Sequence, residues 1–100
     1  MAKVIFSISY DIIPEKRTDY MDVIRELKNL VKAEGLINYS VYEKKNHKNS
    51  FEEIYTFNSL EAYENFEDAQ NERIDILMDK LSDMIKQQST NYSTLIEVEN

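Results

Sequence analysis

The fold is decided by residues 36–57, LINYSVYEKKNHKNSFEEIYTF, which hold two alternating runs separated by a polar turn. Residues 36–45 and 51–57 place large side chains at every second position, and a period of two is typical of a β-strand. The intervening NHKNS, residues 46–50, has the composition of a turn. The segment therefore predicts a β-hairpin with a loop of about five residues.

Strands are also expected near both ends of the chain. Residues 3–10 and 91–98 alternate in the same way, and each run predicts one strand. Between the first strand and the hairpin, residues 15–34 carry apolar side chains three and four positions apart, which predicts an amphipathic helix. Gly35 follows directly and is expected to end this helix in the left-handed conformation.

A second helical region follows the hairpin. It is expected to begin at Asn58 or Ser59, because Asn58 and Glu61 have the spacing of a capping box. The polar run at residues 67–72 predicts a break or a kink. A second apolar stripe then predicts helix up to about Gln88.

In chain order these elements are strand, helix, strand, strand, helix, strand, which is the ferredoxin-like βαββαβ order. Right-handed crossovers place both helical regions on one face of a four-stranded antiparallel sheet. We therefore expect one α+β domain over residues 1–100. The strands carry apolar residues on both faces, such as Ile5 opposite Phe6, so the helix-free face also needs a cover. A second copy of the sheet is the simplest cover, which predicts a homodimer with the form of a dimeric α/β barrel.

Composition limits the classes of function. The net charge is −7, whereas nucleic-acid binding normally requires a basic patch. Lys44, Lys45, His47 and Lys48 form a small basic cluster, which we interpret as the exposed tip of the hairpin. No apolar run approaches the roughly 20 residues of a membrane span, and the first residues do not have the pattern of a signal peptide. The expected partners are a second copy of the chain and a small organic molecule, with no nucleic acid and no membrane.

The sequence predicts neither a metal site nor a cofactor. It contains no cysteine, which excludes thiolate ligands and fits a cytoplasmic location. His47 is the only histidine, and no carboxylate or second ligand is placed beside it. Gly35 is the only glycine, so a glycine-rich phosphate loop is absent.

Aromatic side chains supply most of the candidates for a ligand pocket. Aromatic walls with a few hydroxyl groups suit a flat organic ligand. In the alternative, which we favour, the same rings are core and interface residues whose hydroxyl groups are all hydrogen-bonded. The candidates are Tyr10, Tyr39, Glu53, Tyr55, Phe57 and Phe66.

Glu53 is the only acidic residue among these candidates. It shares a strand face with Tyr55 and Phe57, whereas its neighbour Glu52 points to the opposite face. If buried, the Glu53 carboxyl group would have a raised pKa and could act as a base. The alternative, which the sequence favours, places it in water at the rim of the sheet.

Two segments resemble a known family. Pro14, Glu15 and Lys16, followed by Tyr20, resemble the entry into the first helix of dimeric α/β-barrel proteins, a group that includes the antibiotic biosynthesis monooxygenases. Residues 55–66, YTFNSLEAYENF, resemble the family's passage from the third strand into the second helix. The resemblance implies the same fold over essentially the whole chain.

Phe57 and Phe66 depart from that family's pattern. Many members carry a tryptophan at the position of Phe57 and a histidine at that of Phe66. Haem-degrading relatives use this histidine as the iron ligand, together with a tryptophan and a first-strand asparagine, where this chain has Ser7 and Ser9. The resemblance therefore disfavours haem degradation, and it leaves the catalytic residues unassigned.

Three functions are consistent with these observations. The first is a non-enzymatic dimeric α/β-barrel protein that holds a small aromatic or apolar ligand between its sheet and helices. The second, implied by the resemblance, is a cofactor-independent monooxygenase-like enzyme acting on an aromatic substrate. The third is a regulatory ligand-binding module, because the same element order occurs in such modules.

Overall fold

The structure, a computed structural model, describes residues 2–66 and 71–98. Within this part, the strands and helices follow the order that the sequence predicts. The elements are β1 (Val4–Asp11), a 3-10 turn (Pro14–Lys16), α1 (Arg17–Leu30), β2 (Leu36–Glu43), β3 (Ser50–Phe57), α2 (Leu60–Asn65), α3 (Glu72–Ser82) and β4 (Asn91–Ile96).

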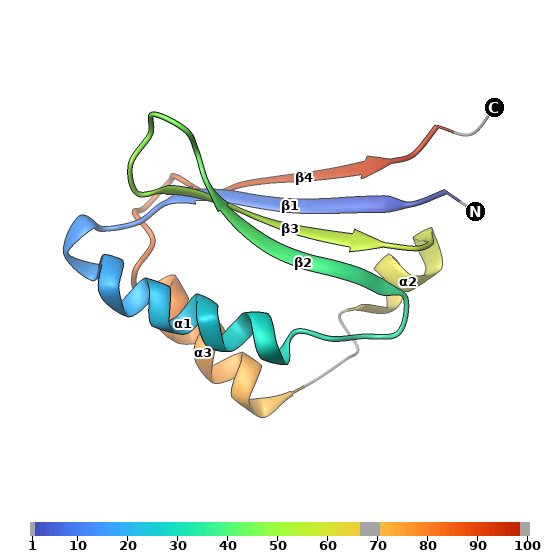
Figure 1. The fold of residues 1–100 in the computed structure, drawn as a ribbon, viewed down its shortest axis with the longest axis horizontal. Coiled ribbons are helices and arrows are strands. Elements are labelled where there is room, and N and C mark those ends of the chain that lie inside the picture. The colour runs from blue at the N-terminus through green and yellow to red at the C-terminus, as the bar shows by residue number, and fades with distance from the viewer. Residues whose placement is uncertain (1, 67–70, 99–100) are drawn as a thin grey trace.

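The strands form one antiparallel sheet in the order β2-β3-β1-β4. The labelled helices all lie on the same side of this sheet (Figure 1). The expected α+β, ferredoxin-like fold is therefore confirmed. Its physical basis is the right-handed crossover, which places each helix on the same face as the one before.

The core lies between this sheet and α1 and α3. Along β3, the helix-facing residues are buried and their neighbours are partly exposed, as a period of two requires. The buried stripe of α1 packs against them. Its members are Tyr20, Val23, Ile24 and Leu27.

Helix α1 ends earlier than the sequence predicts. The last helical residue is Leu30, and Val31 adopts an extended conformation with its side chain buried in the core. Gly35 therefore does not end the helix. It does have a positive φ of 83°, but it uses this conformation to turn the chain into β2, where its carbonyl accepts a hydrogen bond from the backbone N–H of Asn58.

The second helical region also differs in its boundaries. Ser59, rather than Asn58, is the N-cap of α2, because its hydroxyl group accepts a hydrogen bond from the backbone N–H of Ala62. Most of the expected break, residues 67–70, lies outside the described residues, and Asn71 caps the start of α3. That helix ends at Ser82 rather than near residue 88.

The chain leaves α3 early because the segment after it is attached to the end of β1. Ile85 forms an isolated β-bridge with Ile12, and the backbone N–H of Lys86 donates to the carbonyl of Asp11. The hydroxyl group of Ser89 accepts a hydrogen bond from the Asp11 backbone. These contacts divert residues 85–90 from the helix axis and position the start of β4.

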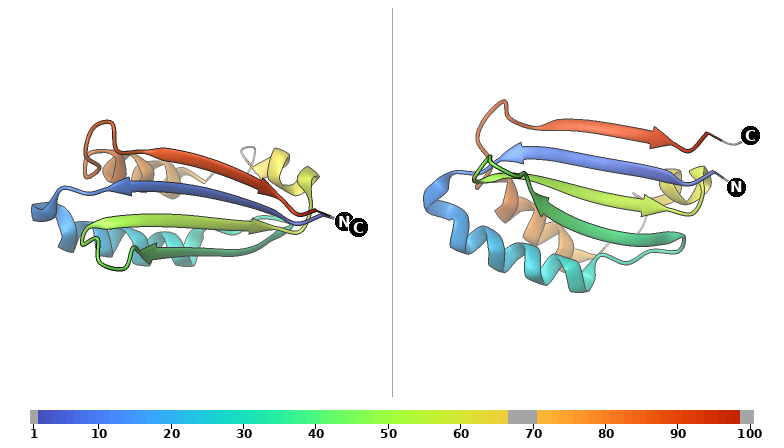
Figure 2. Two further views of the ribbon diagram at one scale, coloured as in Figure 1. Left: turned by 90° about the horizontal axis from the view of Figure 1, so that it is seen from above. Right: turned by 45° about the horizontal axis from the view of Figure 1, so that its top comes forward.

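The other face of the sheet has no helix over it. Seen from above, the strands lie in front of the helices, and none of the described elements crosses this upper face (Figure 2). Ile5 and Leu95 lie opposite one another in the register of β1 and β4, and both side chains are exposed on this outer face. Among the described residues, no helix is long and apolar enough to cross a membrane.

Candidate functional site

A carboxyl group, Glu53, lies inside the core with three tyrosine hydroxyl groups around it. Only 1% of Glu53 is exposed to solvent. Its Oε1 atom accepts hydrogen bonds from Tyr39 at 2.6 Å and, more weakly, from Tyr55 at 3.4 Å. Its Oε2 atom accepts one from Tyr10 at 2.8 Å. The expectation that Glu53 lies at the wet rim of the sheet is therefore wrong.

Strand register explains this arrangement. Glu53 pairs with Ile8 of β1 on one side and with Val41 of β2 on the other. Tyr10 and Tyr39 each stand two positions along those neighbouring strands, which makes them diagonal neighbours of Glu53 on the same face. A long tyrosine side chain spans such a diagonal, so three adjacent strands direct hydroxyl groups to one carboxyl group.

A fourth tyrosine extends the hydrogen-bonded group into α1. The hydroxyl groups of Tyr20 and Tyr10 lie 2.8 Å apart. Because Tyr10 uses its single proton toward Glu53, Tyr20 must donate to Tyr10. With Glu53 ionised, every hydroxyl proton of the group therefore points toward the carboxyl group.

Burial dominates the electrostatics of this group. It raises the pKa of Glu53, and the hydrogen bonds from Tyr39, Tyr10 and Tyr55 oppose that rise without cancelling it. Burial also raises the pKa of Tyr10, Tyr39 and Tyr55, and the nearby Glu53 charge raises each further. The tyrosines therefore stay protonated.

The remaining candidates, Phe57 and Phe66, pack beside this cluster, and Phe66 also lines a separate cavity described below. Phe66 packs edge-on against Tyr55 and Phe57, with ring centroids 5.4 and 5.2 Å apart. Tyr39 and Tyr55 are also in contact, at 4.7 Å between centroids. The rings fill the space between them, as the alternative of core residues with bonded hydroxyl groups describes.

The tyrosine cluster consists of Glu53, Tyr10, Tyr20, Tyr39 and Tyr55. Two of its members, Glu53 and Tyr10, border a groove that we term the α3 groove. It lies between α3 and strands β1 and β4, and its volume is about 370 Å³. Glu53 and Tyr10 form part of its inner wall. The other lining residues are Ile8, Met78, Leu81, Ser82, Ile85, Lys86, Gln87, Gln88, Thr90 and Tyr92.

Two of the six sequence-predicted candidates, Tyr10 and Glu53, line the α3 groove, but the sequence does not predict the groove itself. Met78, Leu81 and Ile85 belong to the apolar stripe that predicts a helix, and nothing in that stripe shows that part of it stays accessible. The opening depends on β4, where every residue is exposed, and on the diverted segment 85–90. The exposure of β4 and the path of residues 85–90 cannot be predicted from local pattern, because they depend on which strand lies at the edge of the sheet.

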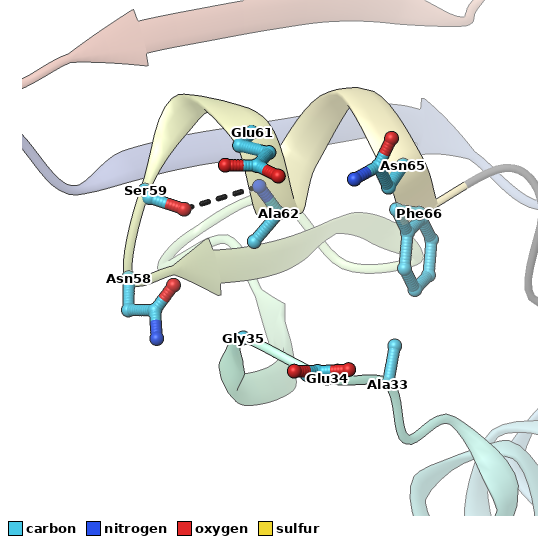
Figure 3. A pocket seen from close by; sticks show the side chains of 9 residues that line it. All are labelled: Ala33, Glu34, Gly35, Asn58, Ser59, Glu61, Ala62, Asn65 and Phe66. Atoms are coloured by element: carbon cyan, nitrogen blue, oxygen red, sulfur yellow. Dashed lines mark hydrogen bonds between the residues drawn. The ribbon is translucent and has the colours of Figure 1, made fainter.

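A second cavity lies at the opposite end of the domain, where the turn before β2 passes below α2 (Figure 3). Its volume is about 500 Å³, and Phe66 separates it from the tyrosine cluster. Two acidic residues, Glu34 and Glu61, line this cavity. Among the described residues, no hydrogen bond joins their carboxylates to each other or to a shared partner. We do not assign a ligand to it.

The predicted basic cluster lies where the sequence places it, in the loop between β2 and β3. His47 and the lysines around it are exposed to solvent. At the base of the loop, Arg17 binds Glu43 with two hydrogen bonds of 2.6 and 2.9 Å and lowers the pKa of that carboxyl group to about 2. This loop stands apart from the α3 groove and contributes nothing to its lining.

The fold corresponds to one structural class, the ferredoxin-like domains typified by antibiotic biosynthesis monooxygenases. A Caulobacter crescentus protein with that provisional name aligns with a TM-score of 0.80 at 15% identity, covering 98% of this chain and 92% of its own. A conserved protein from Methanosarcina mazei aligns at 0.78 and 17% identity, covering 95% and 92%. A variant of SnoaB, a cofactor-independent oxygenase from Streptomyces nogalater, aligns at 0.73 and 10% identity, covering 98% and 95%.

These likenesses establish the fold. The resemblance seen in the sequence is confirmed at that level. No protein-family model and no curated protein matches this chain. Because one fold serves many chemistries, the activity has to be argued from the residues of the site.

Proposed function

We propose that this protein binds a small, largely apolar or aromatic molecule in the α3 groove, between the sheet and the helices. The observation that carries the proposal is the junction of an apolar groove with a buried carboxyl group. Small-molecule sites typically combine apolar walls with a few placed polar groups, in volumes of roughly 300–1,000 Å³. The α3 groove has this character, with Ile8, Met78 and Leu81 on its walls and Glu53 at its inner end.

The proposal predicts that filling the groove abolishes binding. Ser82 is exposed at the end of α3 and lines the groove, so Ser82→Phe places a ring in it without disturbing the core. We expect at least a tenfold loss of affinity, which is about 1.4 kcal/mol. The measurement is an NMR titration of the methyl groups of Ile8 and Leu81 with three probes, 2-phenylethanol, phenethylamine and phenylacetate.

Asp79→Phe is the matched control, since Asp79 is also exposed on α3 but does not line the groove. It should bind the probes as the unmodified protein does. Native mass spectrometry of protein purified from its own source complements the titration, because it detects a retained molecule directly. The proposal fails if no probe shifts the groove methyl groups and no molecule is retained.

An enzymatic role is the second candidate, and the placement of Glu53 favours it. A carboxyl group with a raised pKa at the wall of a groove has the properties of a general base. The structural likeness to an oxygenase that needs no cofactor is consistent with this chemistry. Exposure of the retained molecule to oxygen separates the two functions, because only an enzyme would convert it.

We also propose that two copies of the chain pair through the outer face of the sheet. This face carries Ile5 beside Leu95, with Ile54 on the next strand, and no described helix shields them. These three side chains form a small apolar patch on a face that is otherwise largely polar, with Ser7, Ser40 and Thr56 beside Ile54. An exposed apolar patch rimmed by polar residues is typical of an interface. A second copy is the occupant that matches this mixed face by symmetry, since a two-fold axis brings the apolar patch onto itself and leaves the polar rim in water.

This pairing predicts that a charge within the apolar patch separates the copies. We expect Leu95→Asp to weaken the dimer at least tenfold, because it places an unpaired carboxylate in an apolar interface. Sedimentation at micromolar concentration measures the change. Ile76→Asp is the control, since Ile76 is an exposed apolar residue of α3, and it should leave the mass unchanged. A monomeric unmodified protein would contradict the proposal.

A further inference from the structure

The Glu53 carboxyl group has no positively charged partner among the described residues. The ion pairs of these residues are exposed and lie elsewhere, such as Arg17 with Glu43 and Arg73 with Glu26. Lys86 is the one cationic residue of the α3 groove, and it is exposed and makes no ion pair with Glu53. Hydroxyl groups alone therefore solvate the carboxyl group, and a negative charge there remains uncompensated.

The carboxyl group also keeps one hydrogen-bonding position free. An ionised carboxylate offers about four acceptor positions. Tyr39 and Tyr55 occupy two on Oε1, whereas Tyr10 occupies one on Oε2. The fourth position is therefore on Oε2, the oxygen atom that Tyr10 binds, and both residues are part of the wall of the α3 groove.

Building on the proposed function, we infer that the α3 groove selects an amine on an aromatic or apolar body, whose ammonium group binds Oε2 of Glu53. The ammonium group supplies both missing features, a positive charge and a hydrogen-bond donor. The apolar body then lies along Met78 and Leu81.

Other head groups meet only part of this requirement. A neutral alcohol or phenol donates the hydrogen bond but supplies no positive charge to stabilise the ionised form of Glu53. A carboxylate places a second negative charge beside the first, which is unfavourable in a site of low dielectric constant. The order of affinity should therefore be amine, then alcohol, then carboxylate, for ligands with the same body.

Binding of an ammonium group should also displace a proton from Glu53. Burial raises the pKa of Glu53 and so favours the protonated form in the free protein, whereas a bound cation favours the ionised form. The other ionisable groups that face it do not compensate, because the tyrosines stay neutral and Lys86 is solvated. They are Tyr10 from β1, Tyr20 from α1 through Tyr10, Tyr39 from β2, Tyr55 from β3 and Lys86 after α3.

The test compares phenethylamine, 2-phenylethanol and phenylacetate, which share a ring and differ in the head group. We expect phenethylamine to bind the unmodified protein at least tenfold more tightly than 2-phenylethanol, and phenylacetate to bind most weakly. Glu53→Gln should remove the preference for the amine. Glu52→Gln should retain it, because Glu52 is the neighbouring residue on the opposite face of β3.

A second measurement uses only the unmodified protein, so it does not depend on how Glu53→Gln folds. Calorimetric titration with phenethylamine in two buffers of different ionisation enthalpy should show proton release on binding. If 2-phenylethanol or phenylacetate binds the groove as tightly as phenethylamine, the inference is wrong and the proposed function stands. If no probe binds the groove and no molecule is retained, the proposed function itself is wrong.

Discussion

Replacing Gly35 with alanine should lower the free energy of unfolding by about 2–5 kcal/mol. A Cβ atom at this position would stand 2.4 Å from Cβ of Ala62 and 2.9 Å from Oδ1 of Asn58. The φ of 83° adds the cost of a left-handed conformation, about 1–2 kcal/mol for a residue other than glycine. Overpacking contributes about 1–3 kcal/mol more. Urea denaturation monitored by circular dichroism measures the sum.

The two costs can be separated by a second substitution. Ala62→Gly removes the atom that the new Cβ would meet, so Gly35→Ala in that background should keep only the conformational cost. Ala62→Gly alone provides the reference, because it weakens helix α2 by roughly 1 kcal/mol. Equal effects of Gly35→Ala in the two backgrounds would show that the close approach to α2 does not limit this turn.

Gly35 also shows what local pattern can and cannot predict. The sequence correctly indicates a left-handed residue there, since glycine is the residue that adopts this conformation at little cost. It does not place the residue correctly, because α1 ends four positions earlier. The end of α1 is decided by the burial of Val31 in the core, which is a tertiary contact that helical periodicity does not contain.

The tyrosine cluster is also only partly predictable from the sequence. A period of two correctly places Glu53, Tyr55 and Phe57 on one face of β3. The same pattern cannot show that Tyr10 and Tyr39 lie diagonally across from Glu53, because this depends on the register of three strands. Local polarity alone favoured the rim for Glu53, whereas the hydroxyl groups of neighbouring strands stabilise it in the interior.

The folded protein should lose stability as Glu53 ionises. Burial raises the pKa of Glu53 in the folded state, so the folded state binds more protons than the unfolded state above the ordinary glutamate pKa of about 4.3. Its contribution to stability is therefore complete below that pH and is lost as the pH rises through the raised pKa. Glu43 does not interfere at neutral pH, because Arg17 lowers its pKa and it stays ionised there.

Two substitutions of Glu53 test this prediction. One removes the charge and keeps an acceptor, and the other removes the carboxyl acceptor as well. Glu53→Gln keeps an acceptor for Tyr39 and carries no charge, so the difference in stability from the unmodified protein should shift in favour of the variant as the pH rises from 5 toward 8. Glu53→Met has a similar volume but offers Tyr10 and Tyr39 no carboxyl acceptor. At pH 5 it should cost about 2–4 kcal/mol, since each buried hydroxyl group left unsatisfied costs about 1–3 kcal/mol.

The measurement is urea denaturation of the three proteins across this pH range at one protein concentration. If Glu53→Met is as stable as the unmodified protein at pH 5, the hydroxyl groups do not depend on the carboxyl group. If the difference between Glu53→Gln and the unmodified protein does not change with pH, Glu53 ionises as it does in the unfolded chain. That second result would mean that water reaches the carboxyl group freely, although the structure exposes only 1% of the residue.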